Sequence, residues 1–367
     1  MSTHAIAFDY PARVRRLQDS MGDHDVDVAL LSVGADLPYF TGYEAMATER
    51  LTVLVVRRDR DPVLVIPELE APRVEPGSFE VRPWGETEDP VVLAAGIAGS
   101  PARVAVGDRM WSVFLLGFQK SWTGTDWLPA SELTAPLRMR KDPYEVEALR
   151  TVAHAIDRVM ARLPREVRFA GRTERKVARE AAELILAEGH EVAEFTIIAS
   201  GPNGASPHHE PGERVIEEGD MVVCDLGGRI AGYFSDSTRT FVVGEPTERQ
   251  REVHAVVMAA NAAGREAVAP GIPCEEVDRA ARSVIDEAGY GEFFIHRTGH
   301  GIGLEVHEHP YMVEGNSRPL EAGMTFSVEP GIYLPGEFGV RIEDIVACTT
   351  DGADTLNLSD RRLRVAG

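Results

Sequence analysis

The chain has 367 residues, of which 59 are acidic and 38 basic, so its formal net charge at pH 7 is −21. This acidic excess argues against nucleic acid and anionic membranes as partners, because both bind through basic patches. The length favours about two domains, and 44% hydrophobic residues are enough to build their cores.

The cysteines and the N-terminus indicate the compartment. Cys224, Cys274 and Cys348 are scattered and form no CxxC pair, which suits a reducing compartment and offers no thiolate metal site. The segment 1–16 lacks a basic region followed by an apolar stretch, so we expect no signal peptide. Apolar runs are much shorter than a membrane span. We therefore expect a cytoplasmic protein.

The first third of the chain alternates predicted helix and strand. A helical pattern near 11–21 is followed by strand-like runs at 26–33, 51–59, 62–68 and 102–107. Pro and Gly residues separate these runs, as is typical of turns between strands. This pattern predicts a small α/β unit, in which we find no cluster of catalytic residues.

A domain boundary is predicted near 137–150. Asp142 is a suitable N-cap, Pro143 fits the first helical position and Glu145 completes a capping box. The apolar residues that follow are Val146, Leu149, Ala153, Ile156, Met160 and Leu163. Their alternating spacing of three and four residues predicts an amphipathic helix at the start of the second domain.

The second domain mixes helices with hairpin-connected strands. Further helices are predicted at 173–188, 247–268 and 274–288, with Thr173 and Thr247 as N-caps of the first two. The strand-like runs are FTIIAS, MVVCDLGG, YFSDSTRTFVVG, MTFSVEPGIYL and GVRIEDIVAC. This combination indicates an α+β domain with a largely antiparallel sheet.

The first of two predicted hairpins, at 221–244, carries a pair of aspartates. Its glycines suggest a turn centred between Ile230 and Ala231, which places Asp225 directly opposite Asp236. Cβ atoms of opposed cross-strand residues are about 5 Å apart. Two carboxylates at that separation repel each other unless a proton or a cation lies between them.

The second hairpin, at 326–346, repeats the arrangement. A turn centred on Gly336 places Glu329 opposite Glu343. The two acidic pairs and one histidine would form a site for two divalent cations. Oxygen-rich ligands with a single imidazole favour hard or borderline ions such as Mn²⁺ over a structural zinc.

Opposed acids also occur on exposed sheet faces, where they are solvated or paired with arginines, here Arg239 and Arg341. For one pair alone, solvated or arginine-paired surface acids are the more common explanation. The repetition of the pair beside a segment rich in histidine and glycine favours the metal site.

That segment, HRTGHGIGLEVHEHP at 296–310, matches neither of two familiar motifs. It is not the zinc motif HExxH, because position 311 is Tyr311 and Pro310 opposes the helix that the motif requires. GHGIG is not a dinucleotide fingerprint either, because its glycine spacing differs. The glycines instead allow the backbone to bend closely around a buried site.

Among the histidines, His300 is the best candidate ligand, and we expect His307, beyond the bend, to face the same cavity. We expect His296 and His309 to be structural or exposed. A second pair lies in the Pro-rich stretch SPHHEPGE at 206–213, which in isolation would be interpreted as surface.

The motifs DLGG, FSDSTRTF, HRTGHGIGLEVHEHP, VEPGIY and GVRIED together resemble the metal-dependent aminopeptidases and dipeptidases of the pita-bread fold. The resemblance is strong over 142–360. It implies an α+β pita-bread catalytic domain at 142–367, with a curved antiparallel sheet and flanking helices. The preceding part resembles the smaller α/β N-terminal domain of the prolidase, aminopeptidase P and creatinase branch, and would occupy 1–138. Methionine aminopeptidases usually lack such a domain.

The resemblance also implies metal ligands. Asp225 would chelate the first metal, Asp236 and Glu343 would bridge both metals, and His300 and Glu329 would complete the second. Creatinase relatives that work without metal replace such ligands, whereas this chain keeps the whole set.

Catalytic roles follow from the same resemblance. His208 and His307 match active-site histidines, the first holding substrate and the second stabilising the oxyanion. Glu329 would take the proton of the attacking water. Arg341 matches an arginine that orients the metal carboxylates, and its position two residues before Glu343 puts both on one face of a regular strand.

The implied activity is that of an Xaa-Pro dipeptidase (prolidase-like) with two bound divalent ions, Mn²⁺ in the first place and Co²⁺, Fe²⁺ or Zn²⁺ as alternatives. The alternative substrate class is longer peptides, cleaved by an Xaa-Pro aminopeptidase. Two alternative hypotheses place the chain in other functional classes, as a non-peptide lyase or as a binding protein without catalytic activity. Relatives are often homodimers, and we expect a homodimer with a small peptide substrate and no nucleic acid or membrane partner.

Overall fold

A computed structural model of the chain describes residues 8–75 and 77–366, so residues 1–7 of the segment used to argue against a signal peptide lie outside the described residues. The chain forms two compact units, Met1–Arg138 and Met139–Gly367. In the described part of the chain, none of the helices combines the length and apolar character needed to cross a membrane.

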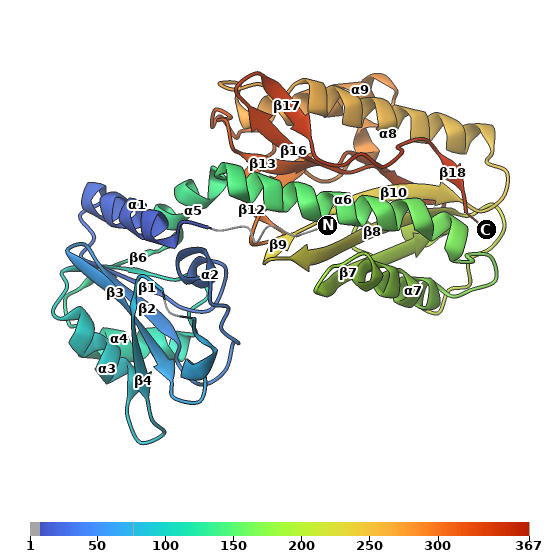
Figure 1. The fold of residues 1–367 in the computed structure, drawn as a ribbon. Coiled ribbons are helices and arrows are strands. Elements are labelled where there is room, and N and C mark those ends of the chain that lie inside the picture. Colours follow the sequence, from blue (N-terminus) through green and yellow to red (C-terminus); the bar gives the residue numbers. More distant parts are fainter. Residues whose placement is uncertain (1–7, 76, 367) are drawn as a thin grey trace. The chain divides into compact units, whose positions relative to one another are not determined.

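The N-terminal unit is built on one mixed sheet with the strand order β4-β3-β2-β1-β5-β6 (Figure 1). Its elements are α1 (Tyr10–Asp23), β1 (Val28–Leu31), α2 (Asp36–Thr41), β2 (Val53–Arg57), β3 (Arg60–Pro67), η1 (Ala71–Arg73), β4 (Glu80–Trp84), α3 (Pro90–Ala98), β5 (Arg103–Val106), α4 (Ser112–Ser121), β6 (Asp126–Pro129) and α5 (Ser131–Met139). Apolar residues of α3 and α4 pack with those of β1, β2, β3 and β5 in one core. The predicted helix and all four predicted strands are confirmed.

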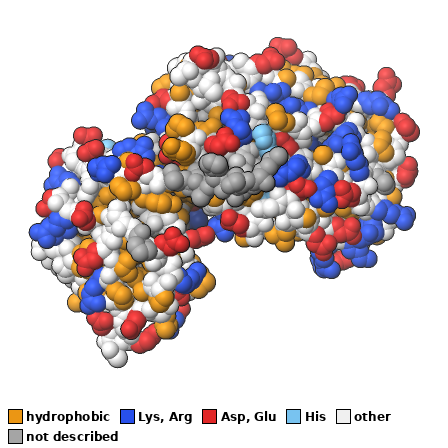
Figure 2. All heavy atoms as spheres, in the orientation of Figure 1, with side chains coloured by type: hydrophobic (Ala, Val, Ile, Leu, Met, Phe, Trp, Pro, Cys, Tyr) orange, Lys and Arg blue, Asp and Glu red, His pale blue; other side chains and the backbone are white. Residues whose placement is uncertain are grey.

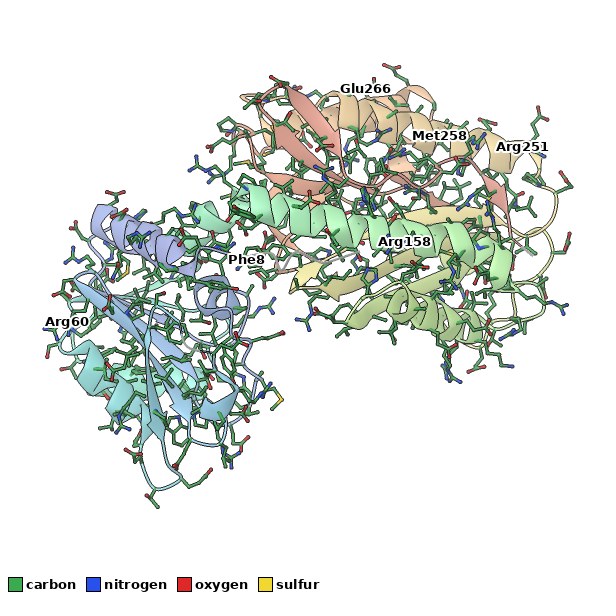
Figure 3. All side chains as sticks on the ribbon, in the orientation of Figure 1. Phe8, Arg60, Arg158, Arg251, Met258 and Glu266 are labelled. Carbon is green, nitrogen blue, oxygen red and sulfur yellow. The ribbon has the colours of Figure 1, made fainter. Side chains whose placement is uncertain are left out.

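Four long helices belong to the second unit: α6 (Pro143–Glu166), α7 (Glu174–Ala187), α8 (Glu248–Glu266) and α9 (Cys274–Glu287). The predicted capping box of α6 is present, since the Asp142 carboxylate accepts from the Glu145 backbone N–H and the Glu145 carboxylate accepts from that of Asp142. Thr247 caps α8, but Thr173 makes no capping hydrogen bond at α7. Arg158 of α6, labelled in Figure 3, donates to Glu188 at the end of α7.

The strands of this unit form two larger sheets and a small one. In chain order they are β7 (Val192–Ser200), β8 (Met221–Ile230), β9 (Tyr233–Phe234), β10 (Ser237–Val242), β11 (Gly299–Gly301), β12 (Glu308–Met312), β13 (Thr325–Val328), β14 (Gly331–Leu334), β15 (Phe338–Arg341), β16 (Asp344–Thr349), β17 (Gly352–Thr355) and β18 (Arg364–Val365). The first sheet has the order β18-β10-β8-β7 with β9 beside β8, the second β12-β11-β13-β16-β17, and β14 pairs with β15. Short 3₁₀ turns are η2 (Gly201–Ala205) and η3 (Gly291–Phe293). Apart from β10 and β18 the pairs are antiparallel, as predicted.

The period of the strands decides which side chains face the helices. Val222, Cys224 and Leu226 of β8 share a core with residues of α6 and α7. Because alternate residues of a strand point to opposite faces, Asp225 faces away from these helices. In the same way Phe326 and Val328 of β13 pack with residues of α9, and Glu329 follows Val328 on the opposite face. The acidic residues therefore lie on the inner faces of the two sheets.

The register predicted for the first hairpin is wrong by two residues. Asp225 lies opposite Thr238, not Asp236. The turn residues are Ala231 and Gly232, with φ of 51° and 80°. Positive φ at both positions is the conformation of tight two-residue hairpin turns, whose twist matches that of the strands. A shift of two residues keeps Asp236 on the same face as Asp225, so the carboxylates stay on one side of the sheet.

The register predicted for the second hairpin is confirmed. The pairs Val328–Asp344 and Gly331–Arg341 both correspond to a turn centred on Gly336. The same register brings Glu329 across from Glu343, in the interval between the two ladders.

A backbone hydrogen bond joins the second hairpin to the first sheet. The N–H of Glu343 donates to the carbonyl oxygen of Thr238 over 3.1 Å. Thr238 is the residue opposite Asp225. The bond therefore connects the hairpin that carries one acidic pair to the hairpin that carries the other.

Candidate metal centre

One cavity of about 520 Å³ collects all the predicted site residues. Its lining comprises Phe195, Ile197, Pro207, His208, Asp225, Asp236, His296, Arg297, His300, Val306, His307, Glu329, Arg341 and Glu343. The acids come from β8, the β9–β10 connection and the second hairpin, and His300 comes from β11. Segments far apart in the sequence thus supply one set of oxygen and imidazole ligands.

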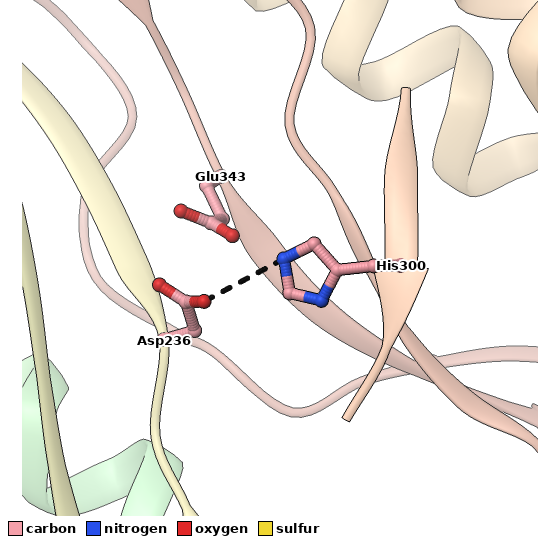
Figure 4. Close-up of side chains that lie close together, drawn as sticks. All are labelled: Asp236, His300 and Glu343. Carbon is pink, nitrogen blue, oxygen red and sulfur yellow. Dashed lines mark ion pairs between the residues drawn. The ribbon is translucent and has the colours of Figure 1, made fainter. Parts of the chain in front are cut away.

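The centre of this set is a group of three buried side chains. Asp236, His300 and Glu343 each offer a ligand atom, and these atoms lie within 4.8 Å of one another (Figure 4). The Nε2 atom of His300 is 3.7 Å from Oδ2 of Asp236 and 3.2 Å from Oε1 of Glu329. A divalent ion with mixed carboxylate and imidazole ligands fits this spacing.

Two carboxylate oxygens at the centre are buried without a hydrogen bond from any described residue. They are Oδ1 of Asp225 and Oδ1 of Asp236. A buried carboxyl oxygen without a partner is costly, because it has lost its hydrogen bonds to water and gained none in exchange. A bound cation supplies the missing interaction, so the orphaned oxygens support a metal site at this place.

Neighbouring side chains fix how the acids are oriented. Arg341 donates from Nη2 to Oδ2 of Asp225 over 2.6 Å. The Thr238 hydroxyl donates to Oε2 of Glu343 over 2.7 Å. The alternative interpretation, in which an arginine pairs with the acids, is thus correct for one oxygen of Asp225. Such contacts orient metal ligands and are a normal part of metal sites.

The crowding of acids shifts their pKa values in the metal-free chain. Burial, followed by the charges of neighbouring acids, raises the pKa of Asp236 well above its usual range. Burial and the charges of Glu329 and Asp225 raise the pKa of Glu343 in the same way. For Glu329 burial acts in the same direction, but hydrogen bonding and charge from His300 outweigh it and lower the pKa to about 2. Glu329 is therefore ionised at neutral pH.

The two other predicted histidines lie at the cavity without entering this group. The ring of His307 meets that of His300 edge-on, with centroids 4.1 Å apart. Burial, followed by the charge of His300, lowers the pKa of His307 to about 4, so its imidazole is neutral at pH 7. His208 also lines the cavity, although its sequence context alone indicated a surface loop.

His296 was expected to be structural or exposed; it is partly buried and also lines the cavity, which was not predicted. Its Nε2 atom is 2.8 Å from the hydroxyl of Tyr333, which accepts a hydrogen bond from Arg341 over 2.9 Å. Arg297 lies over the ring of Tyr311 at 4.2 Å and was not predicted either. His296 and Arg297 begin the motif HRTGHGIGLEVHEHP, so their place in that motif, close to His300, could have indicated them.

Phe195 and Ile197 form an apolar part of the wall and were also missed. They are two residues apart on β7 and so point to the same face of the strand. Ile198, the next residue, points to the other face and packs in the core with residues of α6 and α7. The strand period could have assigned them to the inner face. They give the cavity an apolar side next to its acidic centre.

Two family models match the chain. The Creatinase/Prolidase N-terminal domain matches residues 13–140, and Metallopeptidase family M24 matches residues 147–350.

The relatives are similar over nearly their whole length. "Probable dipeptidase PepE" of Mycobacterium tuberculosis is 43% identical over 360 residues, which cover 95% of this chain and 96% of the relative. The Xaa-Pro dipeptidase of Lactobacillus helveticus is 36% identical over 366 residues, with 95% and 98% coverage. The solved structure of a prolidase from Thermococcus sibiricus has a TM-score of 0.94 at 38% identity and covers 98% of this chain and 100% of that one. These similarities confirm the resemblance and the two-domain fold.

Metal binding should release protons, because the raised pKa values of Asp236 and Glu343 favour their protonated forms in the metal-free chain and a bound cation favours the ionised forms. The affinity for a divalent ion should rise with pH while these protons are being lost, and level off above their pKa values. Titration calorimetry with Mn²⁺ in two buffers of different ionisation enthalpy measures the release. Equal heats in both buffers would contradict the protonated state.

Proposed function

The chain belongs to metallopeptidase family M24, and on that premise we propose that it is an Xaa-Pro dipeptidase with two divalent metal ions. The observation that carries the proposal is the convergence of four carboxylates and His300 in one cavity, where two buried carboxylate oxygens accept no hydrogen bond from the described residues. Full-length relatives named as dipeptidases give the substrate class.

Asp225 would hold the first ion, His300 and Glu329 would hold the second, and Asp236 and Glu343 would be shared between them. The grouping of Asp236, His300 and Glu343 within 4.8 Å supports the bridged side of this assignment. Carboxylate ligands with one imidazole favour Mn²⁺, and Co²⁺, Fe²⁺ and Zn²⁺ also suit them. When bound, a pair of ions supplies a nucleophilic water at neutral pH and polarises a carbonyl group.

Glu329 is proposed as the general base. Its low pKa keeps it ionised at neutral pH, and the Ser327 hydroxyl, which donates to it over 3.1 Å, holds one of its oxygens in place. It would accept a proton from the attacking water and pass it toward the leaving nitrogen. Arg341 keeps Asp225 oriented, through the 2.6 Å contact described above.

His307 and His208 are proposed to act on the substrate. His307 is neutral and can donate a hydrogen bond to the carbonyl oxygen as negative charge develops on it. His208 would hold the substrate and assist at the leaving amine. The roles differ because His307 contacts His300 whereas His208 lies on another loop of the cavity wall.

The apolar side of the cavity suits a proline side chain. Phe195, Ile197, Pro207 and Val306 provide it. A bond before proline lacks an N–H, so its site needs no acceptor for that group. Because the relatives named above are dipeptidases, we prefer a dipeptide substrate over the longer peptides of an Xaa-Pro aminopeptidase.

Setting and assembly complete the proposal. We propose a cytoplasmic location, which the three free, buried cysteines support. We also propose a homodimer, which the family resemblance supports. Figure 2 shows acidic and basic side chains interspersed over the visible face, without a large basic patch. Together with the net charge of −21, this supports a peptide rather than a nucleic acid or a membrane as partner.

Metal-stripped protein reloaded with Mn²⁺ should hydrolyse Ala-Pro and leave Ala-Pro-Ala intact, with both peptides followed by chromatography. Release of Ala from the tripeptide would make the protein an aminopeptidase instead. Cleavage of neither peptide by metal-loaded protein would contradict the proposal and favour a lyase or a binding protein.

Glu329→Gln should lower kcat for Ala-Pro by about 10²–10⁴-fold, the usual contribution of a general base. His307→Ala should also lower kcat severely, with the metal content unchanged, because His307 is not assigned as a ligand. Steady-state kinetics and elemental analysis of the same samples measure both. The matched controls are Glu337→Gln, at an exposed position of the same hairpin as Glu329, and His309→Ala, at an exposed position two residues after His307; both should behave as wild type. Loss of metal from His307→Ala would show that its role is wrongly assigned.

A further inference from the structure

The loop that carries His208 is anchored to one buried carboxylate. Glu174, the first residue of α7, has a side chain that is 0% exposed, although it lies outside the lining of the metal-site cavity. Among the described residues, its side chain forms hydrogen bonds with the stretch 200–212, which connects the end of β7 to the segment before β8.

Both oxygens of this carboxylate are engaged. Oε1 accepts from the backbone N–H and the hydroxyl of Ser200, each over 2.8 Å, and from Nδ2 of Asn203 over 3.0 Å. Oε2 contacts Nε2 of His209 at 2.8 Å and accepts from the N–H of Gly212 over 3.2 Å. Burial opposes ionisation, but these donors outweigh it and lower the pKa of Glu174. The loop is thus tied at its beginning, middle and end to one ionised group.

His208 depends on this loop for its position. Its imidazole makes no hydrogen bond to any other described residue, and it is exposed to the cavity. Its neighbour His209 points to Glu174 instead. The side chain of His209 therefore anchors the loop backbone to Glu174, whereas the side chain of His208 faces the cavity.

We propose that Glu174 is a positioning residue, which acts through His209 and the 200–212 loop to hold His208 at the substrate. The inference rests on the function proposed above and extends it to a residue outside the cavity. Displacement of a catalytic group by about 1 Å can cost as much as a hundredfold in rate. An anchor of this kind therefore affects turnover without touching substrate or metal.

The test is Glu174→Gln, which keeps the shape of the side chain. A carboxamide puts an NH₂ group against donors that cannot accept, the N–H of Ser200 or of Gly212, so part of the anchor is lost. We expect kcat/KM for Ala-Pro to fall about tenfold to a hundredfold, with the metal content unchanged. In a His208→Ala background the same substitution should change kcat/KM by less than about twofold, because residues that act through one another are not additive.

Asp157→Asn is the matched control. Asp157 is another buried carboxylate of this unit, and it accepts from Nδ2 of Asn357 over 3.2 Å and from the N–H of Leu358, away from the cavity. Its substitution should reduce stability and leave kcat/KM within about twofold of wild type. An equal effect of Glu174→Gln with and without His208 would overturn the proposal, because Glu174 would then act on the fold.

Two further measurements keep the inference testable. If Glu174→Gln does not fold, His209→Ala removes a single contact at a position that is 20% exposed, and its effect must likewise vanish in the His208→Ala background. Amide hydrogen exchange of 200–212 without substrate should speed up in Glu174→Gln and not in Asp157→Asn. Unchanged exchange would overturn the anchor whether or not the protein cleaves Ala-Pro, whereas a wild type inactive on Ala-Pro contradicts only the proposed function.

Discussion

Carboxylates buried side by side cannot all be ionised unless positive charge lies among them, and the second unit is organised around this constraint. Arg341 reaches one oxygen of Asp225, and His300 approaches Glu329 and Asp236. These contacts leave Asp236 and Glu343 with raised pKa values and leave buried oxygens without partners. The protein itself therefore supplies too little positive charge, and divalent cations would supply the rest.

Asp344, the residue after Glu343, shows another way to compensate a buried carboxylate, namely pairing with arginines. It is fully buried on the opposite face of the strand, where Arg239 donates to it over 2.8 Å and Arg361 over 2.7 Å. Burial raises its pKa, but the two arginines outweigh burial and the pKa is lowered. Two neighbouring acids, Glu343 and Asp344, are thus compensated by different means. Arginines compensate the charge of Asp344, whose role is structural. Glu343 lines the cavity, where the arginines do not compensate all the acids.

Much of this could be predicted from the sequence, because strand and helix periods and capping residues act locally. The capping box of α6 and the register around Gly336 follow from such local patterns and were confirmed. The register of the first hairpin was wrong because the preference of the turn for Ala231 and Gly232 at positive φ was not recognised. The contact of His296 with Tyr333 and the anchoring contacts of Glu174 could not be predicted, because each joins residues that are distant in the sequence.

The number of ions held by the chain tests the central claim most directly. Metal-stripped protein reloaded with Mn²⁺, freed of loose metal and analysed by elemental mass spectrometry, should contain about two ions per chain, the complement of a two-metal site. Glu343→Gln removes a bridging carboxylate and should lower both occupancies, whereas Glu337→Gln at an exposed position should lower neither. A wild type without bound metal, or a Glu343→Gln protein that keeps the full complement, would contradict the account.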